Sequence, residues 1–491
     1  MFSADNPNVP YPEELSLQSV NLFFRHGART PAASVFAKEL GLPRFWPLCA
    51  GVKHRSTGLL GHAALQDNPF AWQRVIETFD SDDGPLLPKD NDNLCLHGEL
   101  TDHGRAGMVA LGVELRRLYV DRLKLLPGVL SEPDSICFRA SPYPRALESL
   151  QHVIRGFLPP GSSASSFGRA RIVMRSPEDE TLLPNEEYCE RFIQISRAYA
   201  RRTAGRWNHS AEIQYLNMLL GKYMPPTRPV AVDARPGIHA IHDMISCTSA
   251  SGTPDVRLPE EFYEPEVMQI VEHIAYEEEF GAYEANEEAR RLGIGSILGD
   301  VVQRMVNTAQ KPGSSTKLFL AGSHDSTVGA MATSLGSVDS ARSGNWPPYG
   351  SVLAIELFQD RNTAPRLGGG TGWPGIGRTP ISELSDQQKQ SLQHHYVRLR
   401  YNDGVLVVPG CRPSGRNWRG DPSFCTLAAF KEIVDRFTPT AWRDSCARRL
   451  DQPCFPAKVE LAGFLALHIS FFQYSLGTRR AGTYNVPVPN G

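Results

Sequence analysis

Arg25, His26 and Arg29 are the residues with the clearest chemical potential, and they come directly after residues 19–24, in which apolar side chains alternate with their neighbours. That alternation is typical of the buried face of a β-strand. Arginine keeps its charge at any working pH and offers a planar fork of donors that fits phosphate oxygens. Histidine can act as a nucleophile or as a base. The trio indicates phosphoryl chemistry; the alternative is a strand end with solvated arginines.

Two further strands are predicted to end in polar residues. Residues 135–141 read as a strand that leads through prolines into a helix, with Arg145 at the N-terminus of that helix. A helix N-terminus favours an anion, because its free N–H groups and its dipole point there. Residues 317–322 read as a buried strand followed at once by His324 and Asp325, with a helix expected from Val328 to Leu335.

Ligands of open α/β sheets bind beyond the carboxyl ends of the strands, so these polar residues are expected to meet. Arg139, within the second strand, would be a fourth arginine beside the three already named. Arginines together with a protonated histidine could neutralise phosphoryl oxygens without a metal ion, and catalysis would then rest on positioning and charge stabilisation.

The rest of the chain predicts an α/β protein with an inserted, mostly helical cap domain. Strand patterns occur near both ends of the chain, and helical patterns dominate between them. The predicted parts are a split α/β catalytic domain (15–31, 98–175 and 313–450), an insertion near the site (32–97), a helical cap domain (176–312) and a C-terminal tail (451–491).

Local signals refine this outline. Thr101 is the expected N-cap of a helix that runs to about Val120, and residues 396–408 predict a hairpin. The glycines between 368 and 377 lack the Lys-Ser/Thr ending of a P-loop and predict a surface loop. The apolar run 461–472 is too short to cross a bilayer and predicts a buried helix instead.

Composition excludes some classes of partner. The 491 residues carry a net charge of −2 and an isoelectric point near 6.7, which argues against a nucleic-acid partner. No transmembrane segment or secretory signal is visible, so a cytoplasmic or organellar location is expected rather than secretion. His239 and His242 are interpreted as structural histidines, because zinc sites take three or four protein ligands. The oligomeric state stays open.

The motif Arg25-His26-Gly27-x-Arg29-x-Pro31 with a distant His324-Asp325 resembles the histidine acid phosphatases. Further segments occur in that family's order: Leu100-Thr101-x-x-Gly104, Arg139-x-Ser141-x-x-x-Arg145 and the late pair Cys411 and Cys425. Within the family the chain looks most like the lysophosphatidic acid phosphatases, on the segments Leu183-Pro184-Asn185 with Cys189, Trp346-Pro347-Pro348-Tyr349 and the hairpin that ends at Cys411.

The resemblance implies a fold, a reaction and a role for each site residue. The fold would be a phosphoglycerate mutase-like central sheet flanked by helices, and the substrate a small phosphate monoester, with no metal and no other cofactor. The implied roles are a nucleophile that forms phosphohistidine (His26), phosphate ligands (Arg25, Arg29, Arg145 and His324) and a general acid that later activates water (Asp325). Such an enzyme should be most active in acid and lose activity as His324 loses its proton, around pH 6 to 7 for an unshifted imidazole.

Three other functions remain open. A phosphotransferase of the mutase type normally pairs its histidines with a glutamate, whereas Asp325 stands beside His324 here. A phytase-like inositol phosphate phosphatase would share the same catalytic residues. An inactive anion-binding protein would be expected to lack the nucleophile, which this chain retains.

Nine cysteines without a C-x-x-C pair support neither a zinc ribbon nor a thioredoxin-type site. The resemblance implies that Cys411 pairs with Cys425 and Cys189 with Cys446. The alternative is four reduced and buried thiols, which a cytosolic location would favour.

Overall fold

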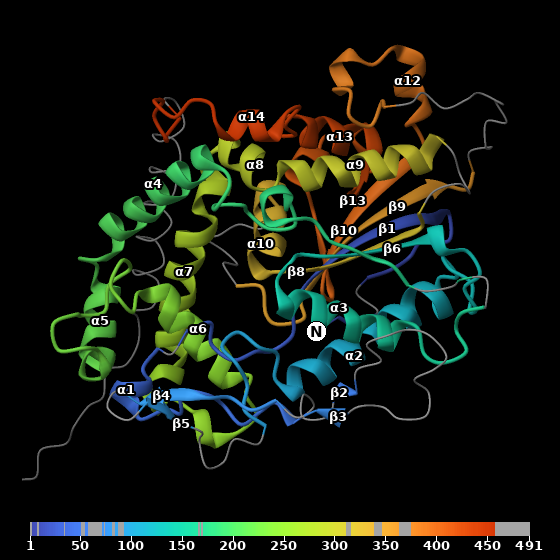
Figure 1. Ribbon diagram of the computed structural model, residues 1–491. Coiled ribbons are helices and arrows are strands. Elements are labelled where there is room, and N and C mark those ends of the chain that lie inside the picture. The colour runs from blue at the N-terminus through green and yellow to red at the C-terminus, as the bar shows by residue number, and fades with distance from the viewer. Residues whose placement is uncertain are drawn as a thin grey trace, which may run out of the picture. The chain divides into compact units, whose positions relative to one another are not determined.

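A nine-stranded mixed sheet forms the centre of the protein in this computed structural model (Figure 1). Its order is β12-β13-β10-β9-β1-β8-β6-β7, with β11 paired to β10. The strands are β1 (Leu15–Arg25), β6 (Ile136–Ala140), β7 (Ile172–Val173), β8 (Leu318–Ser323), β9 (Val352–Asp360), β10 (His395–Tyr401), β11 (Gly404–Leu406), β12 (Asn417–Trp418) and β13 (Asp421–Thr426).

The structure describes residues 2–6, 9–33, 35–50, 55–56, 71–72, 74–80, 84–86, 93–164, 167, 170–310, 316–337, 346–362 and 375–456. Most of the predicted glycine loop and the whole of the predicted helix 461–472 lie outside these residues. Residues Met1–Leu450 form one compact unit. The division of that unit into a catalytic domain and a cap therefore stays a prediction.

Strands β1, β8, β6 and β7 run parallel, as the sequence predicts for the strands that end in polar residues. Arg25 lies level with Ser323, and Ala140 lies level with Gly322, so the residues that follow these strands emerge side by side. Strand β9 is antiparallel to β1, and its first residue, Val352, pairs with Phe24. The segment that enters β9 consequently reaches the same edge of the sheet.

Helices cover both faces of the sheet (Figure 1). On one face α2 (Asp102–Arg116) and α3 (Pro144–Phe157) pack on the core side chains of β1, β6 and β8. On the other face lie α9 (Gly295–Gln310), which contacts β1, and α13 (Leu427–Asp435), which contacts β10. The mixed α/β fold that the sequence predicts is confirmed.

The region predicted to be helical contains α4 (Glu190–Trp207), α5 (Ala211–Leu220), α6 (Ile238–Ser249), α7 (Pro265–Ala285) and α8 (Glu287–Gly293), followed by α9. Helix α7 packs against α4, α6 and α10 (Asp325–Ser334). Further α-helices among the described residues are α1 (Ala37–Leu40), α12 (Asp386–Ser391) and α14 (Trp442–Cys446). The insertion contributes two short strand pairs, β2 (Arg55–Ser56) with β3 (Ala71–Trp72) and β4 (Thr78–Asp80) with β5 (Gly84–Leu86). None of the helices among the described residues is long and apolar enough to cross a bilayer.

Two helix starts test the sequence interpretation. Thr101 caps α2 as predicted, because its hydroxyl accepts from the Gly104 N–H at 3.1 Å. Helix α10 begins at Asp325, whereas the periodicity predicted Val328. The Thr327 hydroxyl accepts from the backbone N–H of His324 and fixes the first turn three residues earlier. Asp325 therefore lies on a helix rather than in a loop.

Three disulfides are present among the described residues. The pairs Cys411–Cys425 and Cys189–Cys446 are those that the resemblance implies. Cys49–Cys95 was not predicted, and it closes a 46-residue stretch of the insertion. Disulfides are typical of oxidising compartments, and the location of the protein stays a prediction.

Two glycines allow the loop after β1 to cross the start of α2. A Cβ on Gly104 would lie 2.0 Å from the Ala28 carbonyl oxygen, and a Cβ on Gly27 would lie 2.7 Å from the Gly104 carbonyl oxygen. Real Cβ atoms do not approach backbone this closely. This crossing fixes the backbone that directly follows His26 against the helix.

Gly104→Ala should therefore displace the loop that carries His26. We expect a loss of about 1–3 kcal/mol in the free energy of unfolding, as for other overpacked sites, together with a large fall in kcat/KM. Gly107→Ala is the matched control, because Gly107 lies one turn further along α2 with open space around it. The control should be neutral or up to about 1 kcal/mol more stable. Equal behaviour of the two variants in thermal unfolding and kinetics would contradict this account.

Candidate active site

The polar residues that follow β1, β8 and β6 meet at one edge of the sheet, as predicted. The backbone N–H of His26 donates to Ser323 O at 3.0 Å, and that of Ser141 donates to Gly322 O at 3.2 Å. The rings of His26 and His324 have centroids 5.5 Å apart. These two hydrogen bonds extend the strand pairing by one residue beyond the ends of β1 and β6. They fix the backbone from which the side chains of the site project.

His26 is oriented by its own loop. Its Nδ1 lies 3.0 Å from the carbonyl oxygen of Gly27. A carbonyl can only accept, so Nδ1 carries the proton and Nε2 keeps a free lone pair. Burial lowers the pKa of His26 well below 6.5, and the neighbouring charges of Arg25 and Arg29 lower it further. The ring is therefore neutral and nucleophilic even in mildly acidic solution.

Arg25 and Arg29 are each tied to a carboxylate. Arg25 donates to Pro347 O at 2.6 Å and pairs with Asp325 at 2.8 Å, and its guanidinium lies 4.0 Å from the centroid of the Tyr349 ring. Arg29 pairs with Asp243 of α6 at 2.8 Å. Both guanidinium groups are thus held in place before a ligand arrives.

Arg145 differs from Arg25 and Arg29 in that no ion pair to a carboxylate is seen for it among the described residues. It lies in the first turn of α3, where its guanidinium carbon is 4.8 Å from the centroid of the Tyr143 ring. Its Nε is buried without a hydrogen-bond partner within the described part of the chain, and so are the Nε atoms of Arg25 and Arg29. Buried donors without partners are costly, which favours an anion at this position.

His324 occupies the predicted place but not the predicted charge state. Its Nε2 lies 2.7 Å from Ser141 Oγ. Burial, together with the charge of Arg145, lowers the pKa of His324 to about 3. The expectation of a cationic His324 is therefore wrong for the ligand-free protein, because its buried position beside arginines disfavours a further positive charge.

Asp325 is held at both oxygens. Its Oδ2 accepts from Arg25 at 2.8 Å and from the indole N–H of Trp346 at 3.0 Å, and its Oδ1 accepts from the Ser326 N–H at 3.0 Å. Burial raises the pKa of Asp325, but the charge of Arg25 and the indole donor outweigh burial and hold it well below 3.8. The carboxyl group is ionised in the ligand-free protein.

Arg139 does not join the cluster, so the prediction of a fourth arginine is wrong. Its guanidinium donates to Glu180 at 2.6 Å and to Thr181 at 3.3 Å, inside the protein. Glu180 also accepts from the backbone N–H groups of Thr181 and Leu182. Arg139 therefore stabilises the segment around residue 180 and leaves the anion site to the other three arginines.

Several residues around the site escaped prediction. Asp243 and Cys247 of α6 contact Arg29, and Trp346 and Tyr349 contact Asp325 and Arg25. The last two lie in the segment that enters β9. Strand direction could have revealed them, because the start of an antiparallel strand shares an edge with the ends of the parallel strands.

His239 and His242 have the structural role that the sequence suggested. Their rings pack on Trp346 at centroid distances of 5.3 and 4.6 Å. Burial lowers the pKa of His242 to about 3. Within the described residues, no group of three or more His, Cys, Asp or Glu side chains is arranged to hold a metal ion.

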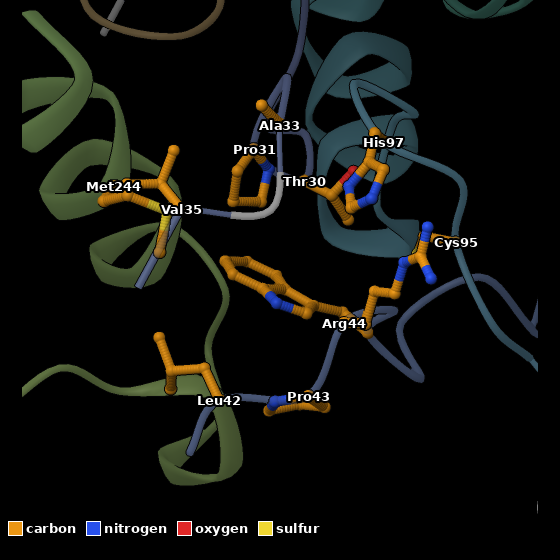
Figure 2. Close-up of a pocket in the computed structure, with 11 residues that line it drawn as sticks. Thr30, Pro31, Ala33, Val35, Leu42, Pro43, Arg44, Cys95, His97 and Met244 are labelled. Atoms are coloured by element: carbon orange, nitrogen blue, oxygen red, sulfur yellow. The ribbon is translucent and has the colours of Figure 1, made fainter. Parts of the chain in front are cut away.

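A small pocket adjoins the loop after Arg29 (Figure 2). Figure 2 shows Met244 and Val35 on one side and Thr30 and His97 on the other, with Leu42 below. Its walls also include Pro31, Ala33, Pro43, Arg44, Trp46 and Cys95. The pocket thus combines apolar side chains with Thr30, Arg44 and His97, and it is close in sequence to the phosphate ligands.

The chain belongs to the histidine phosphatase superfamily, branch 2, whose family model matches residues 16–402. A probable acid phosphatase of Schizosaccharomyces pombe is 31% identical over 469 residues, which cover 91% of this chain and 97% of that protein. Lysophosphatidic acid phosphatase type 6 of Bos taurus is 23% identical over 370 residues, 73% of this chain and 78% of the relative.

Among solved structures, a Hafnia alvei phytase in complex with tartrate matches with a TM-score of 0.53 and 13% identity, over 89% of this chain and 99% of the phytase. The likeness shows a shared fold. The resemblance inferred from the motifs is confirmed, and the protein is a phosphomonoesterase of the acid phosphatase type.

The charge states predict how activity depends on pH. The ligand-free site holds a neutral His26 and an ionised Asp325, so the proton for the leaving group has to arrive with the substrate. A phosphate monoester keeps one proton below its second pKa, near 6. We expect kcat/KM to be highest in acid, below the second pKa of the substrate, because burial and the arginines favour neutral His26, and to fall about tenfold per pH unit above roughly 6.

The test is to measure kcat/KM against pH for two substrates with different second pKa values. The pH above which kcat/KM falls should be higher for the substrate with the higher second pKa. A limb fixed near 6.5 for both substrates would instead assign it to a histidine.

Proposed function

We propose that this protein hydrolyses phosphate monoesters by transferring the phosphoryl group to Nε2 of His26. The observation that carries the proposal is the hydrogen bond from His26 Nδ1 to Gly27 O, which leaves Nε2 as a free nucleophile beside three arginines. The three arginines carry three positive charges, and the carboxylates of Asp325 and Asp243 carry two negative charges. The net charge of +1 matches a phosphate monoester monoanion.

In the first step, Nε2 of His26 bonds to phosphorus while the bond from phosphorus to the ester oxygen breaks. Arg25, Arg29 and Arg145 hold the equatorial oxygens, with His324 as a further ligand, and stabilise their charge. Asp325 receives the substrate's proton on binding and gives it to the departing alkoxide, which leaves as the alcohol.

In the second step, Asp325 is again a carboxylate and takes a proton from water. The water oxygen bonds to phosphorus, the P–N bond to His26 breaks, and inorganic phosphate leaves. One carboxyl group therefore serves both half-reactions, first as acid and then as base.

The substrate that the site supports best is a phosphate monoester with an apolar chain, such as lysophosphatidic acid. The apolar side chains in the pocket beside Thr30 and Pro31 support this choice, because those two residues follow the phosphate ligand Arg29 in the chain. The similarity to lysophosphatidic acid phosphatases supports the same choice. The mutase alternative is disfavoured by Asp325 in place of glutamate, and the inactive alternative by the intact His26. A phytase-like preference is the alternative that substrate assays decide.

His26→Ala and Asp325→Asn should fail in different ways. His26→Ala should abolish turnover and covalent labelling on a protein that still folds. Asp325→Asn keeps the nucleophile and the arginines but cannot protonate an alkoxide. Alkyl phosphates should slow by ~10²–10⁴-fold, and aryl phosphates such as p-nitrophenyl phosphate much less.

Turnover of both esters and acid-labile phosphate on the quenched protein are the measurements, with the exposed Asp255→Asn as control. Labelling that persists in His26→Ala would contradict the nucleophile assignment. Equal losses on both esters in Asp325→Asn would contradict the assignment of the general acid.

Chain length tests the proposed substrate class. Lengthening the apolar chain of the ester should raise kcat/KM, by about fourfold for a methylene that becomes fully buried, from roughly 0.8 kcal/mol per buried methylene. Leu42→Asp places a charge in the pocket wall and should remove this dependence while short-chain esters keep their rates. Leu96→Asp is the control, because Leu96 is exposed and outside the pocket lining. A flat response to chain length, with inositol hexakisphosphate as the better substrate, would favour the phytase alternative.

A further inference from the structure

Trp346 lies between the general acid and the helices that pack beside it. Its indole is buried, and its N–H donates to Asp325 Oδ2 at 3.0 Å. Its backbone N–H donates to Glu272 of α7 at 2.6 Å. Its ring packs on His242 of α6 and on Phe280 of α7. Two helices therefore fix the indole, and the indole contacts the acid.

The hydrogen bonds at Asp325 distinguish its two oxygens. Each carboxylate oxygen has two lone-pair directions. Oδ2 accepts from Arg25 and from Trp346, which uses both. Oδ1 accepts from the Ser326 N–H and, as far as the described residues reach, keeps one direction open. A proton on Asp325 consequently belongs on Oδ1 as long as both donors to Oδ2 are present.

We propose that Trp346 is a positioning residue that occupies Oδ2 of Asp325 and thereby directs the transferable proton to Oδ1. Arg25 alone would leave one lone pair of Oδ2 open, and the proton could then reside on an oxygen turned toward the guanidinium. The inference rests on the general-acid role of Asp325 in the proposed function.

The electrostatic setting of Asp325 gives the direction of the pH effect. The ionisable groups that face it are Arg25, His26, Arg29, Arg145, His324, His242 of α6 and Glu279 of α7. Trp346→Phe removes a donor to the ionised carboxylate and leaves these groups in place. A lost donor raises the carboxyl pKa, so the acid form should persist to higher pH.

The test is Trp346→Phe, which keeps an aromatic ring against His242 and Phe280. Loss of a hydrogen bond to a charged group, about 1.5–3 kcal/mol, corresponds to a roughly 10- to 150-fold fall in kcat. We expect this fall for an alkyl phosphate and a much smaller one for p-nitrophenyl phosphate. The falling limb of kcat against pH should move to higher pH. A residue that only supports packing would lower both rates alike and leave the limb in place.

Trp418→Phe is the matched control. It removes another indole-to-carboxylate bond, to Asp360 at 3.2 Å, in a separate core cluster with Leu15, Phe358 and Phe424. Its kinetics should match the parent protein.

Thermal unfolding shows whether Trp346→Phe folds. If it does not, Glu272→Ala cuts the backbone contact that seats Trp346, and it should give the same dependence on the leaving group with a smaller size. Equal losses on both esters, or an unmoved pH limb, overturn the inference. Trp346→Phe can give one of these results while Asp325→Asn still slows the alkyl ester more than the aryl ester. In that case only the inference about Trp346 fails. If Asp325→Asn does not discriminate, the general-acid assignment itself fails.

Discussion

Excess positive charge, buried at the carboxyl edge of the sheet, is the constraint on which the rest of the site depends. Arg25 and Arg29 are buried there beside the half-buried Arg145, and two carboxylates only partly balance the three charges. Such a cluster keeps both histidines neutral, because a further cation there would be unfavourable. The same excess attracts a single anionic group and gives the nucleophile its free lone pair in acid. Binding and nucleophilicity thus have one electrostatic origin.

The antiparallel strand β9 supplies what the parallel strands cannot. Parallel strands bring His26, Ser141 and His324 to one edge through their carboxyl ends. Strand β9 approaches that edge from the opposite direction, so its N-terminal segment delivers Trp346 and Tyr349 to the other side of Arg25 and Asp325. The mixed sheet therefore encloses the cluster from two chain directions.

Sequence reasoning located the residues that react, because the Arg-His-Gly motif and the His-Asp pair follow strands whose periodicity is plain. It failed where a partner is distant in the chain. In the sequence, Arg139 looks like the arginines that do line the site. Its partner, Glu180, lies 41 positions away and is found only from the fold. The low pKa of His324 depends on burial beside arginines from two other segments, which spacing cannot show. Cys49–Cys95 lies in a stretch with little periodicity and no counterpart in the motifs that carried the resemblance.

Because helix α6 forms one wall of the pocket, substitutions in different walls should have different effects on substrate specificity. Asp243 holds Arg29, and its sequence neighbour Met244 lines the pocket, so substitutions on this wall act on phosphate binding and leaving-group fit together. Another part of the wall, around Leu42 and Trp46, belongs to an insertion that contains its own disulfide. Its side chains can vary while the arginines keep their partners. Divergence of substrate range, in nature or in the laboratory, should therefore accumulate in the insertion and spare the helix.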